Sequence, residues 1–177
     1  MFEQLTAALK ETFKDEVLST AVYKDEFTAM VKKSAIKHVC NYVKFQQGFN
    51  YCADICGTDR FTEEDRFEVV YNLLNLATKT RIRLKVWVDE TDLHVPSVVE
   101  VWPAANWHER ETFDMYGVLF DGHPDLRRMY MPEDFEYFPM RKDYPLIGVP
   151  GSIPLPPIDP KAQSQRQGER YNDGETV

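Results

Sequence analysis

The stretch WHERETFDMYGVLFDGHPDLRRMYMPEDFEYFPMRKDYPL, residues 107–146, is the part of the chain around which the rest is organised. Acidic and basic side chains alternate there with Trp, Phe, Met and Tyr, and charges that only face water do not need such neighbours. The pattern therefore predicts charges held at a buried or partner-covered surface. The candidate structural and interface residues are Glu109, Arg110, Glu111, Asp114, Gly117, His123, Asp125, Arg127, Arg128, Arg141, Lys142 and Asp143.

A helix is predicted at the start of this stretch. Asn106, followed by Glu109 three residues later, resembles a capping box at the helix N-terminus. Gly117 is a typical helix stop, because glycine adopts the left-handed conformation that ends many helices. The sequence therefore predicts a helix over about residues 106–117.

Two stripes of this helix each place a carboxylate beside large apolar groups. At helical spacing the stripes are Trp107, Glu111, Met115 and Glu109, Phe113, Tyr116. A buried carboxylate without a partner is very costly, so a cationic partner is expected for each. Arg127 and Arg128 are the nearest candidates in sequence, and we expect Glu111 in particular to pair with an arginine.

The chain before residue 96 is predicted to alternate between helices and strands. One helix is expected over residues 2–12, and a second from Ser34, a plausible N-cap, to about Gln47. Alternating apolar runs predict strands over residues 17–22, 27–32, 49–56, 67–76 and 82–88. Pro96 suits the first turn of a short helix that ends near Trp102. The predicted fold class is α+β, with a mixed or antiparallel sheet of about five strands and helices mainly on one face.

The last predicted strand has a cationic face. Its alternating residues are Ile82, Leu84, Val86, Val88 on one side and Arg81, Arg83, Lys85, Trp87 on the other. The first set belongs in a core, because successive side chains in a strand point to opposite faces. The second set is either a solvated sheet face or a docking face for an acidic partner, and the sequence leaves both open.

A proline-rich tail follows the charged stretch. All eleven prolines lie at or after position 96, and six lie between positions 145 and 160. Proline removes backbone donors, so this part cannot form regular helix or sheet for long. We predict an α+β domain over residues 1–140 and a long irregular extension over residues 141–177. Because the extension is apolar yet cannot build its own core, it is predicted to be an extended partner-binding tail.

Composition limits the possible locations and partners. The chain has 177 residues, and no apolar run reaches the roughly 20 residues of a membrane-spanning helix. A net charge of −8 argues against nucleic acid as the default partner. The acidic start MFEQLTAALKETFKDE lacks the features of a signal or transit peptide. We therefore expect a protein kept in a cytoplasm or encoded within an organelle.

The cysteines do not suggest a cofactor site. Three cysteines are an odd count, which suits a reducing compartment. Cys52 and Cys56 are expected to share one face of a strand, and Cys40 to lie in a helix. This spacing lacks the four thiolates usual for an iron–sulfur cluster, so the cysteines are predicted to be small buried apolar residues.

A metal-dependent hydrolase is an alternative from another functional class. Its candidate ligands are His108, Glu109, Glu111, Asp114, His123 and Asp125. However, Thr112 stands where the zinc-protease motif needs a second histidine, and the neighbouring arginines would repel a cation. No nucleotide-binding glycine motif is present in the sequence. His123 is better explained as a hydrogen-bonded structural residue than as a catalytic base.

The charged stretch resembles the signature of the 30 kDa-type subunit of respiratory complex I, which is the C subunit of bacterial proton-pumping NADH:quinone oxidoreductase. The matching segments are Glu109-Arg110-Glu111, Asp114-Met115-Tyr116-Gly117, Gly122-His123-Pro124-Asp125-Leu126-Arg127-Arg128, Met131-Pro132-Glu133-Asp134 and Arg141-Lys142-Asp143-Tyr144-Pro145-Leu146. One departure is Tyr137-Phe138, where the family usually carries Gly-His or Gly-Tyr before the final proline. A weaker likeness extends upstream to about residue 50.

This resemblance implies a function that the residues alone do not give. Similar chains are non-catalytic scaffold subunits of the peripheral arm of complex I, which passes electrons from NADH to quinone and pumps protons. The chain would bind no cofactor itself, while the complex would hold FMN, iron–sulfur clusters and quinone. The implied partners are the 49 kDa-type subunit and the subunit that carries the terminal iron–sulfur cluster.

The resemblance also implies a place and leaves one close alternative. The chain would be peripheral on the cytoplasmic side of a bacterial inner membrane or, if organelle-encoded, on the matrix or stromal side. The alternative is the same scaffold in a related quinone reductase driven by ferredoxin or by cofactor F420. The sequence does not record which electron-input subunits accompany the chain.

Overall fold

The alternating apolar residues between Val17 and Val88 form a five-stranded sheet in the computed structural model, which describes residues 2–24, 26–62, 64–146 and 148–149. The strands are β1 (Val17–Tyr23), β2 (Glu26–Val31), β3 (Tyr51–Asp59), β4 (Phe67–Asn75) and β5 (Thr80–Val88). Their order in the sheet is β1-β2-β5-β4-β3. The β2–β5 pair is parallel and the other pairs are antiparallel, so the sheet is mixed.

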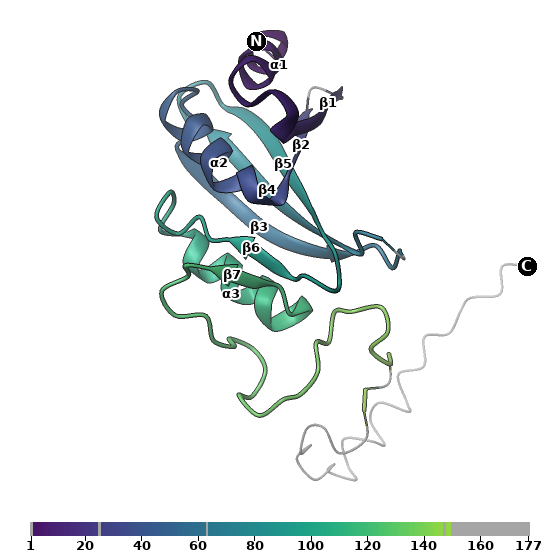
Figure 1. Cartoon of the computed structure of the whole chain (residues 1–177). Coiled ribbons are helices and arrows are strands. Elements are labelled where there is room, and N and C mark those ends of the chain that lie inside the picture. The colour runs from purple at the N-terminus through teal and green to yellow at the C-terminus, as the bar shows by residue number, and fades with distance from the viewer. Residues whose placement is uncertain (1, 25, 63, 147, 150–177) are drawn as a thin grey trace, which may run out of the picture.

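Two helices cover one face of this sheet (Figure 1). They are α1 (Phe2–Phe13) and α2 (Ile36–Phe45), each adjoined by a short 3-10 turn, η1 (Lys14–Glu16) and η2 (Lys33–Ala35). Leu5 and Leu9 of α1 join Val39 and Val43 of α2 in the core. The rings of Phe2 and Phe27 stack with their centroids 5.9 Å apart, which fastens α1 to the sheet. The predicted α+β class, with helices on one face, is confirmed.

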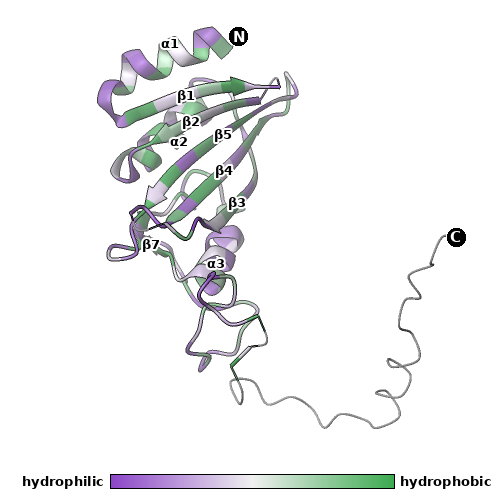
Figure 2. Cartoon of the chain, turned by 90° about the vertical axis from the view of Figure 1, so that its right-hand side faces the viewer, coloured by the Kyte–Doolittle hydropathy of each residue, from purple (hydrophilic) through white to green (hydrophobic). Residues whose placement is uncertain are grey.

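A third helix closes one edge of the sheet. α3 (Ala105–Tyr116) lies against the edge strand β3, below the sheet in Figures 1 and 2. The Thr112 hydroxyl donates to the Ile55 carbonyl at 3.2 Å, which satisfies an edge acceptor that has no neighbouring strand. Close packing requires Gly57, because a Cβ there would lie 2.5 Å from the Tyr116 ring.

The predicted short helix after Pro96 is wrong. Pro96 instead ends a strand, β6 (His94–Pro96), which pairs in parallel with β7 (Leu119–Asp121). Ser97 donates its backbone N–H to the Asp121 carbonyl, so the pairing continues one residue past the strand. Proline is tolerated at that place because it ends a short strand in a sheet of two.

Two smaller expectations also fail. Cys52 and Cys56 do not share a strand face, because the register of β3 against β4 shifts between Cys52 and Asp54. Cys52 and Ile55 are therefore buried, while Cys56 is half-buried. Ser34 does not cap α2, which starts at Ile36 after η2 with Ala35 as its N-cap and no side-chain cap bond.

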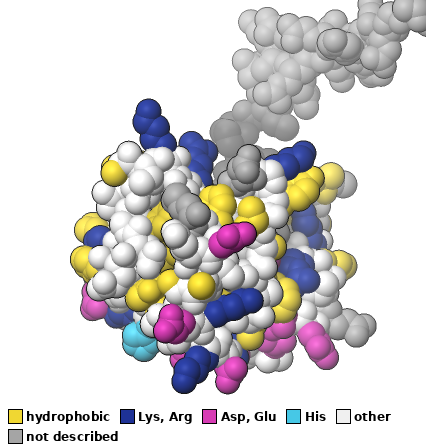
Figure 3. Space-filling model, turned by 90° about the horizontal axis from the view of Figure 1, so that it is seen from above, with side chains coloured by type: hydrophobic (Ala, Val, Ile, Leu, Met, Phe, Trp, Pro, Cys, Tyr) yellow, Lys and Arg dark blue, Asp and Glu magenta, His cyan; other side chains and the backbone are white. Residues whose placement is uncertain are grey.

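The proline-rich tail lies outside the described residues beyond Val149, so its partner-binding role and the boundary at residue 140 stay predictions. Within the described part, no helix is long and apolar enough to cross a membrane. Seen from the α1 end, acidic and basic side chains are interspersed with apolar ones (Figure 3).

Candidate functional site

The charged stretch is organised by two carboxylates of α3 that are fully buried. Glu109 and Asp114 are each 0% exposed. Glu109 faces the turn at residues 97–98, and Asp114 faces the chain at residues 128–131. The two groups meet very different partners, so they are described separately.

Asp114 is the centre of a group of charged residues that bind the chain after β7. We call this group the ionic frame, and it comprises Arg110, Asp114, Arg128 and Arg141. Its carboxylate accepts hydrogen bonds from the backbone N–H groups of Met129, Tyr130 and Met131 at 2.6–3.0 Å. It also accepts from Nη1 of Arg128 at 2.8 Å. Burial alone would raise the pKa of Asp114, but these donors outweigh burial and hold the pKa below its usual range. Arg128 was expected to pair with Glu109 or Glu111, but in the structure its partner is Asp114.

Glu109 has no cationic partner among the described residues. The Ser97 hydroxyl and the Val98 backbone N–H donate to its carboxylate, both at 2.7 Å. Burial raises the pKa of Glu109 to about 7. The predicted capping box is wrong, because α3 begins at Ala105 without a side-chain cap. Glu109 instead accepts from the turn that follows β6.

Arg110 and His123 hold the chain that leaves β7. Arg110 donates from Nε to the carbonyl of Arg127 at 3.0 Å and from Nη2 to the carbonyl of Arg128 at 3.2 Å. Nε2 of His123 lies 3.1 Å from the Asn106 carbonyl, and its Nδ1 lies 3.0 Å from the backbone N of Asp125. Those two contacts fit a neutral imidazole that donates from Nε2 and accepts at Nδ1.

Gly117 makes room for Arg141. It ends α3 in the left-handed conformation, with φ at 81°. A Cβ at this position would lie 2.7 Å from Nη2 of Arg141 and 2.8 Å from the Phe138 ring. Arg141 lies between the rings of Phe67 and Phe138, at 5.0 and 4.6 Å from their centroids, and donates to the Tyr116 carbonyl at 2.7 Å. Burial lowers the pKa of this guanidinium.

A second ionic cluster lies where β3 ends and β4 begins. Arg66 binds both carboxylate oxygens of Asp59, from Nε at 3.1 Å and from Nη2 at 2.8 Å. Its Nη1 also reaches Glu90 at 2.8 Å and Asp143 at 3.2 Å. Asp59 in addition accepts the Lys142 backbone N–H at 2.7 Å. Pairing with Asp59 raises the pKa of Arg66. The predicted candidates Lys142 and Asp143 are therefore bonded to the domain.

Sequence reasoning missed Asp59, Arg66 and Ser97. Asp59 looked like an ordinary turn residue after Gly57 and Thr58. A usable signal was the pair of opposite charges at the facing ends of two adjacent predicted strands. Ser97 gave no signal, because its role depends on the unexpected strand that ends at Pro96.

Three of the predicted charges lie on the surface and take no part in the frame. Glu111 is exposed, and no ion pair holds it within residues 2–24, 26–62 and 64–146, so the expected pairing with an arginine is wrong. Trp107, on the same stripe, is 57% exposed, whereas α3 contacts β3 through Thr112 and Tyr116. Asp125 and Arg127 pair at 3.0 Å with both side chains more than half exposed.

Among the described residues, the metal-ligating types do not gather. No group of three or more His, Cys, Asp or Glu side chains within that part of the chain could hold a metal ion. Burial raises the pKa of the Cys52 thiol to about 12 and that of Cys56 to about 11, so neither is an activated nucleophile. His108 pairs with Asp54 at 3.3 Å and not with the other proposed ligands.

The frame fixes a segment that has no regular structure. The C-terminal segment, residues 123–146, contains no helix or strand, yet its backbone is bonded to Asp114, Arg110, Asp59 and Arg128. Hydrogen bonds from buried charged side chains thus replace the backbone–backbone hydrogen bonds of a helix or sheet. Large apolar side chains on this segment remain exposed: Tyr130, Tyr137, Met140 and Leu146.

The chain has relatives among known proteins over most of its length. Residues 29–150 match the family described as respiratory-chain NADH dehydrogenase, 30 kDa subunit. The NADH-quinone oxidoreductase C subunit of Methylobacterium sp. (strain 4-46) is 48% identical over 148 residues, which are 82% of this chain and 68% of that protein. Its counterpart in Geobacter metallireducens is 44% identical over 147 residues, covering 82% and 90% of the two chains.

Solved structures share the fold. The trypsin-resistant fragment (1–134) of Nqo5 is 32% identical, with a TM-score of 0.60 over 70% of this chain and 99% of that one. A chain of the membrane-bound sulfane sulfur reductase, an archaeal respiratory membrane complex, has a TM-score of 0.72 at 20% identity, over 99% and 96% of the two chains. At that identity the likeness concerns the fold alone.

The mixed sheet, its flanking helices and the ion-bonded segment define an α+β domain of the type seen in the Nqo5 fragment. The chain belongs to the respiratory-chain NADH dehydrogenase 30 kDa subunit family, whose curated members include the C subunits of NADH-quinone oxidoreductase named above. The resemblance seen in the sequence is thereby confirmed.

Proposed function

We propose that the chain is a non-catalytic scaffold subunit of the peripheral arm of a proton-pumping NADH:quinone oxidoreductase, and that it docks on the 49 kDa-type subunit. Family membership supports the assignment to complex I. The observation that carries the scaffold role is the C-terminal segment, which is fixed by buried charges and still presents large apolar side chains. Tyr130 is 59% exposed and Met140 is 51% exposed, on a backbone that Asp114 and Met115 hold in place.

The bonding of the charged residues supports a structural role over a catalytic one. A general acid or base must reach a substrate proton within hydrogen-bond distance. Glu109 and Asp114 are fully buried, and both ring nitrogens of His123 are engaged by the backbone. In this proposal the chain binds no cofactor, and FMN, the iron–sulfur clusters and quinone belong to other subunits. The subunit with the terminal iron–sulfur cluster is the second proposed neighbour.

Exposed aromatic and methionine side chains are typical of the centre of a protein interface. A rigid backbone beneath them lowers the entropy lost on docking, because the segment is already ordered before it meets its partner. The proline-rich tail is proposed to extend this contact. In the cell the chain would then be peripheral, on the cytoplasmic side of the inner membrane.

Affinity purification of the tagged full-length chain from its own membranes tests the proposal. We expect the 49 kDa-type subunit and an NADH-oxidising module to co-purify. Co-purification of a ferredoxin- or F420-linked module would instead assign the same scaffold to a related reductase. The double variant Tyr130→Ser, Met140→Ser should lose most of the 49 kDa-type subunit, whereas Phe45→Ser, a similarly exposed site on α2, should retain it. Equal recovery in all three proteins would contradict the docking surface.

A further inference from the structure

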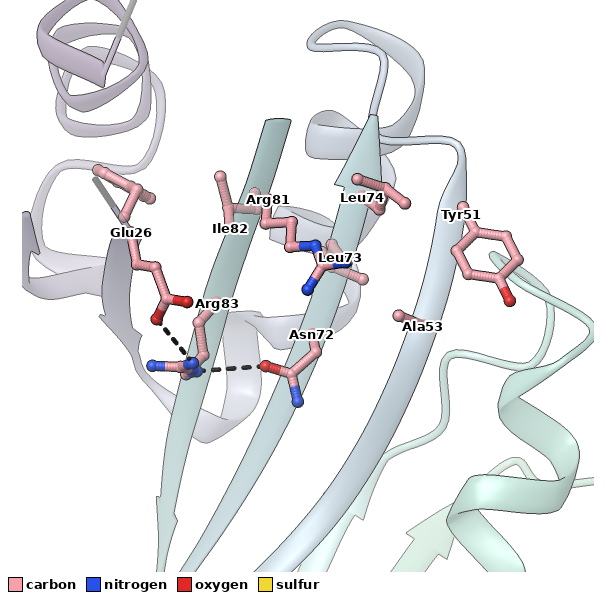
Figure 4. Close-up of a pocket in the computed structure, with 10 residues that line it drawn as sticks. Glu26, Tyr51, Ala53, Asn72, Leu73, Leu74, Arg81, Ile82 and Arg83 are labelled. Carbon is pink, nitrogen blue, oxygen red and sulfur yellow. Dashed lines mark hydrogen bonds and ion pairs between the residues drawn. The ribbon is translucent and has the colours of Figure 1, made fainter. Parts of the chain in front are cut away.

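The open face of the five-stranded sheet, opposite α1 and α2, has a hollow of about 230 Å³. It lies where β3 and β5 begin and β4 ends, and its lining includes both arginines of the cationic strand face (Figure 4). The residues that matter below are Glu26, Tyr51, Asn72, Leu74, Arg81 and Arg83. None of them belongs to the ionic frame of α3.

Three outward side chains form a row across this hollow. Strand register places Arg81 of β5 opposite Leu74 of β4, and Leu74 opposite Tyr51 of β3. In Figure 4 the Arg81 side chain extends from β5 toward β4. Tyr51 is 48% exposed at the far side of the row. An arginine, a leucine and a tyrosine therefore line one continuous strip of surface.

The basic side chains of this face differ in whether they have a hydrogen-bond or ion-pair partner. Arg83 donates to the Asn72 side chain at 3.2 Å and pairs with Glu26 at 3.1 Å. Lys85 pairs with Glu68 at 2.9 Å. For Arg81, no ion pair or hydrogen bond from the side chain occurs within residues 2–24, 26–62 and 64–146. Within those residues the face thus has an unmatched cation, in a chain whose net charge is −8.

The chemistry of the row selects an occupant. A guanidinium offers a planar fork of N–H donors that matches both oxygens of a carboxylate. Leu74 and the Tyr51 ring, on the two neighbouring strands, supply an apolar surface beside it. Exposed Tyr23, the last residue of β1, and Leu76, the residue after β4, lie at the same end of the sheet. Arginine and tyrosine within an apolar surround are typical of residues that dominate interface energies.

We propose that this hollow is a docking site for a carboxylate side chain, aspartate or glutamate, of a neighbouring protein chain, held by Arg81 and flanked by Leu74 and Tyr51. It lies at the opposite strand ends from the cluster of Asp59 and Arg66, to which residues 142 and 143 are bonded. The proposed site and the C-terminal segment therefore lie at opposite ends of the sheet. The inference does not depend on which oxidoreductase contains the chain.

Site-specific photo-crosslinking in intact cells tests this site. p-Benzoylphenylalanine replaces Tyr51 in the full-length chain, and the crosslinked peptide is mapped by mass spectrometry. The expected result is a peptide from another chain with an aspartate or glutamate next to the crosslinked residue. A crosslink to a peptide without an acidic residue, to residues 150–177 of this same chain, or to nothing at all would overturn the proposal.

Charge reversal at Arg81 is the second test of the proposed site. In the Tyr51-labelled chain, Arg81→Glu should reduce the crosslink by about tenfold or more, and Arg81→Gln by less, because the first variant adds repulsion to the lost pairing. Lys10→Glu makes the same charge change at an exposed position of α1 and should leave the crosslink intact. Reversing the mapped partner carboxylate to arginine should restore it in Arg81→Glu. Unchanged crosslinking in Arg81→Glu, or failure of the swap to restore it, would refute the assignment.

Two controls separate this result from other failures. Arg81 is exposed and has no partner in the described part of the chain, so Arg81→Glu should melt at the wild-type temperature. If the wild-type chain co-purifies with the 49 kDa-type subunit while Arg81→Glu keeps the crosslink, the inference fails and the proposed function stands. If co-purification fails but the acidic crosslink is found, the proposed function fails and the inference stands.

Discussion

The sheet and the C-terminal segment are ordered by opposite means. Between Val17 and Val88 the backbone is bonded mainly to itself, and apolar burial supplies most of the stability. Between His123 and Leu146 the backbone has no neighbouring strand, and carboxylates and guanidiniums take the place of backbone partners. A fold can therefore extend beyond its sheet without secondary structure, provided that each buried charge bonds several backbone groups.

The largest effect expected from this comparison is the loss of Asp114. Asp114→Ala leaves Arg128 buried without its partner and three backbone N–H groups unsatisfied. We expect a loss of about 3–5 kcal/mol in the free energy of unfolding, measured in urea. Asp125→Ala, which breaks an exposed pair in the same segment, should change it by about 0–1 kcal/mol. Equal effects of the two variants would show that the frame is no stronger than a surface pair.

The next effect is a pH dependence caused by Glu109. Its folded pKa of about 7 lies above the ordinary value of 4.5, so the folded chain holds this proton more strongly than the unfolded chain. The resulting stabilisation is complete below about pH 4.5 and is lost as the pH rises through about 7, a total of about 3 kcal/mol. Glu109→Gln cannot titrate, so the stability advantage of wild type over this variant should fall between about pH 5 and about pH 8.

Thermal melts of both proteins across this range give the measurement. Asp114 acts in the opposite direction, because its pKa is lowered in the folded chain. The stability that this adds is present above the ordinary pKa of an aspartate and is lost as the pH falls below that value. The wild-type chain should consequently lose stability on both sides of mildly acidic pH. Parallel pH profiles for wild type and Glu109→Gln would mean that Glu109 titrates normally.

A smaller effect is expected at two glycines that share the left-handed backbone conformation. Gly117 and Gly122 both have φ near +80°, but a Cβ at Gly122 meets nothing within 4 Å. Gly122→Ala should thus cost only the left-handed conformation, about 1–2 kcal/mol. Gly117→Ala should cost more, because its Cβ also displaces Arg141 and Phe138. Denaturation midpoints of the two variants test this ranking, and equal midpoints would show that Arg141 moves aside freely.

The smallest effect is expected at Glu111. It lies on the same helix as Asp114 but faces outward, and the described residues give it no ion pair. Glu111→Ala should change the free energy of unfolding by about 0.5 kcal/mol or less. A loss comparable to that of Asp114→Ala would mean that Glu111 is held within the fold after all.

Much of the sheet could be predicted because its signals are local. All five strands were expected within a few residues of their observed ends, since alternation and turn residues mark them. The bulge at Cys52 and the strand at Pro96 could not be predicted, because each depends on a partner strand that sequence spacing does not reveal. Within the site, sequence nearness indicated Arg128 as the partner of a buried carboxylate on α3, but for Glu109 or Glu111 and not for Asp114.

The cationic partners expected for Glu109 and Glu111 are not found among the described residues, for a similar reason. Both follow helical spacing beside large apolar side chains, so periodicity cannot tell which face of α3 meets the sheet. The contact of Thr112 with Ile55 decides it, and that contact spans 57 positions of sequence. Asp59 and Arg66 were missed because neither has a distinctive neighbour in the sequence, although they lie only 7 positions apart.

The parallel pairing of β2 with β5 also sets the order in which the chain can fold. Phe27 pairs with Ile82, so the connection between them contains α2, β3 and β4. The β1–β2 hairpin and the β3-β4-β5 meander join neighbours in sequence and can form from local contacts, whereas joining the two requires closure of a long loop. During synthesis, which proceeds from the N-terminus, the β2 edge stays unpaired until β5 leaves the ribosome. Until then the unpaired edge of β2 can pair with another strand.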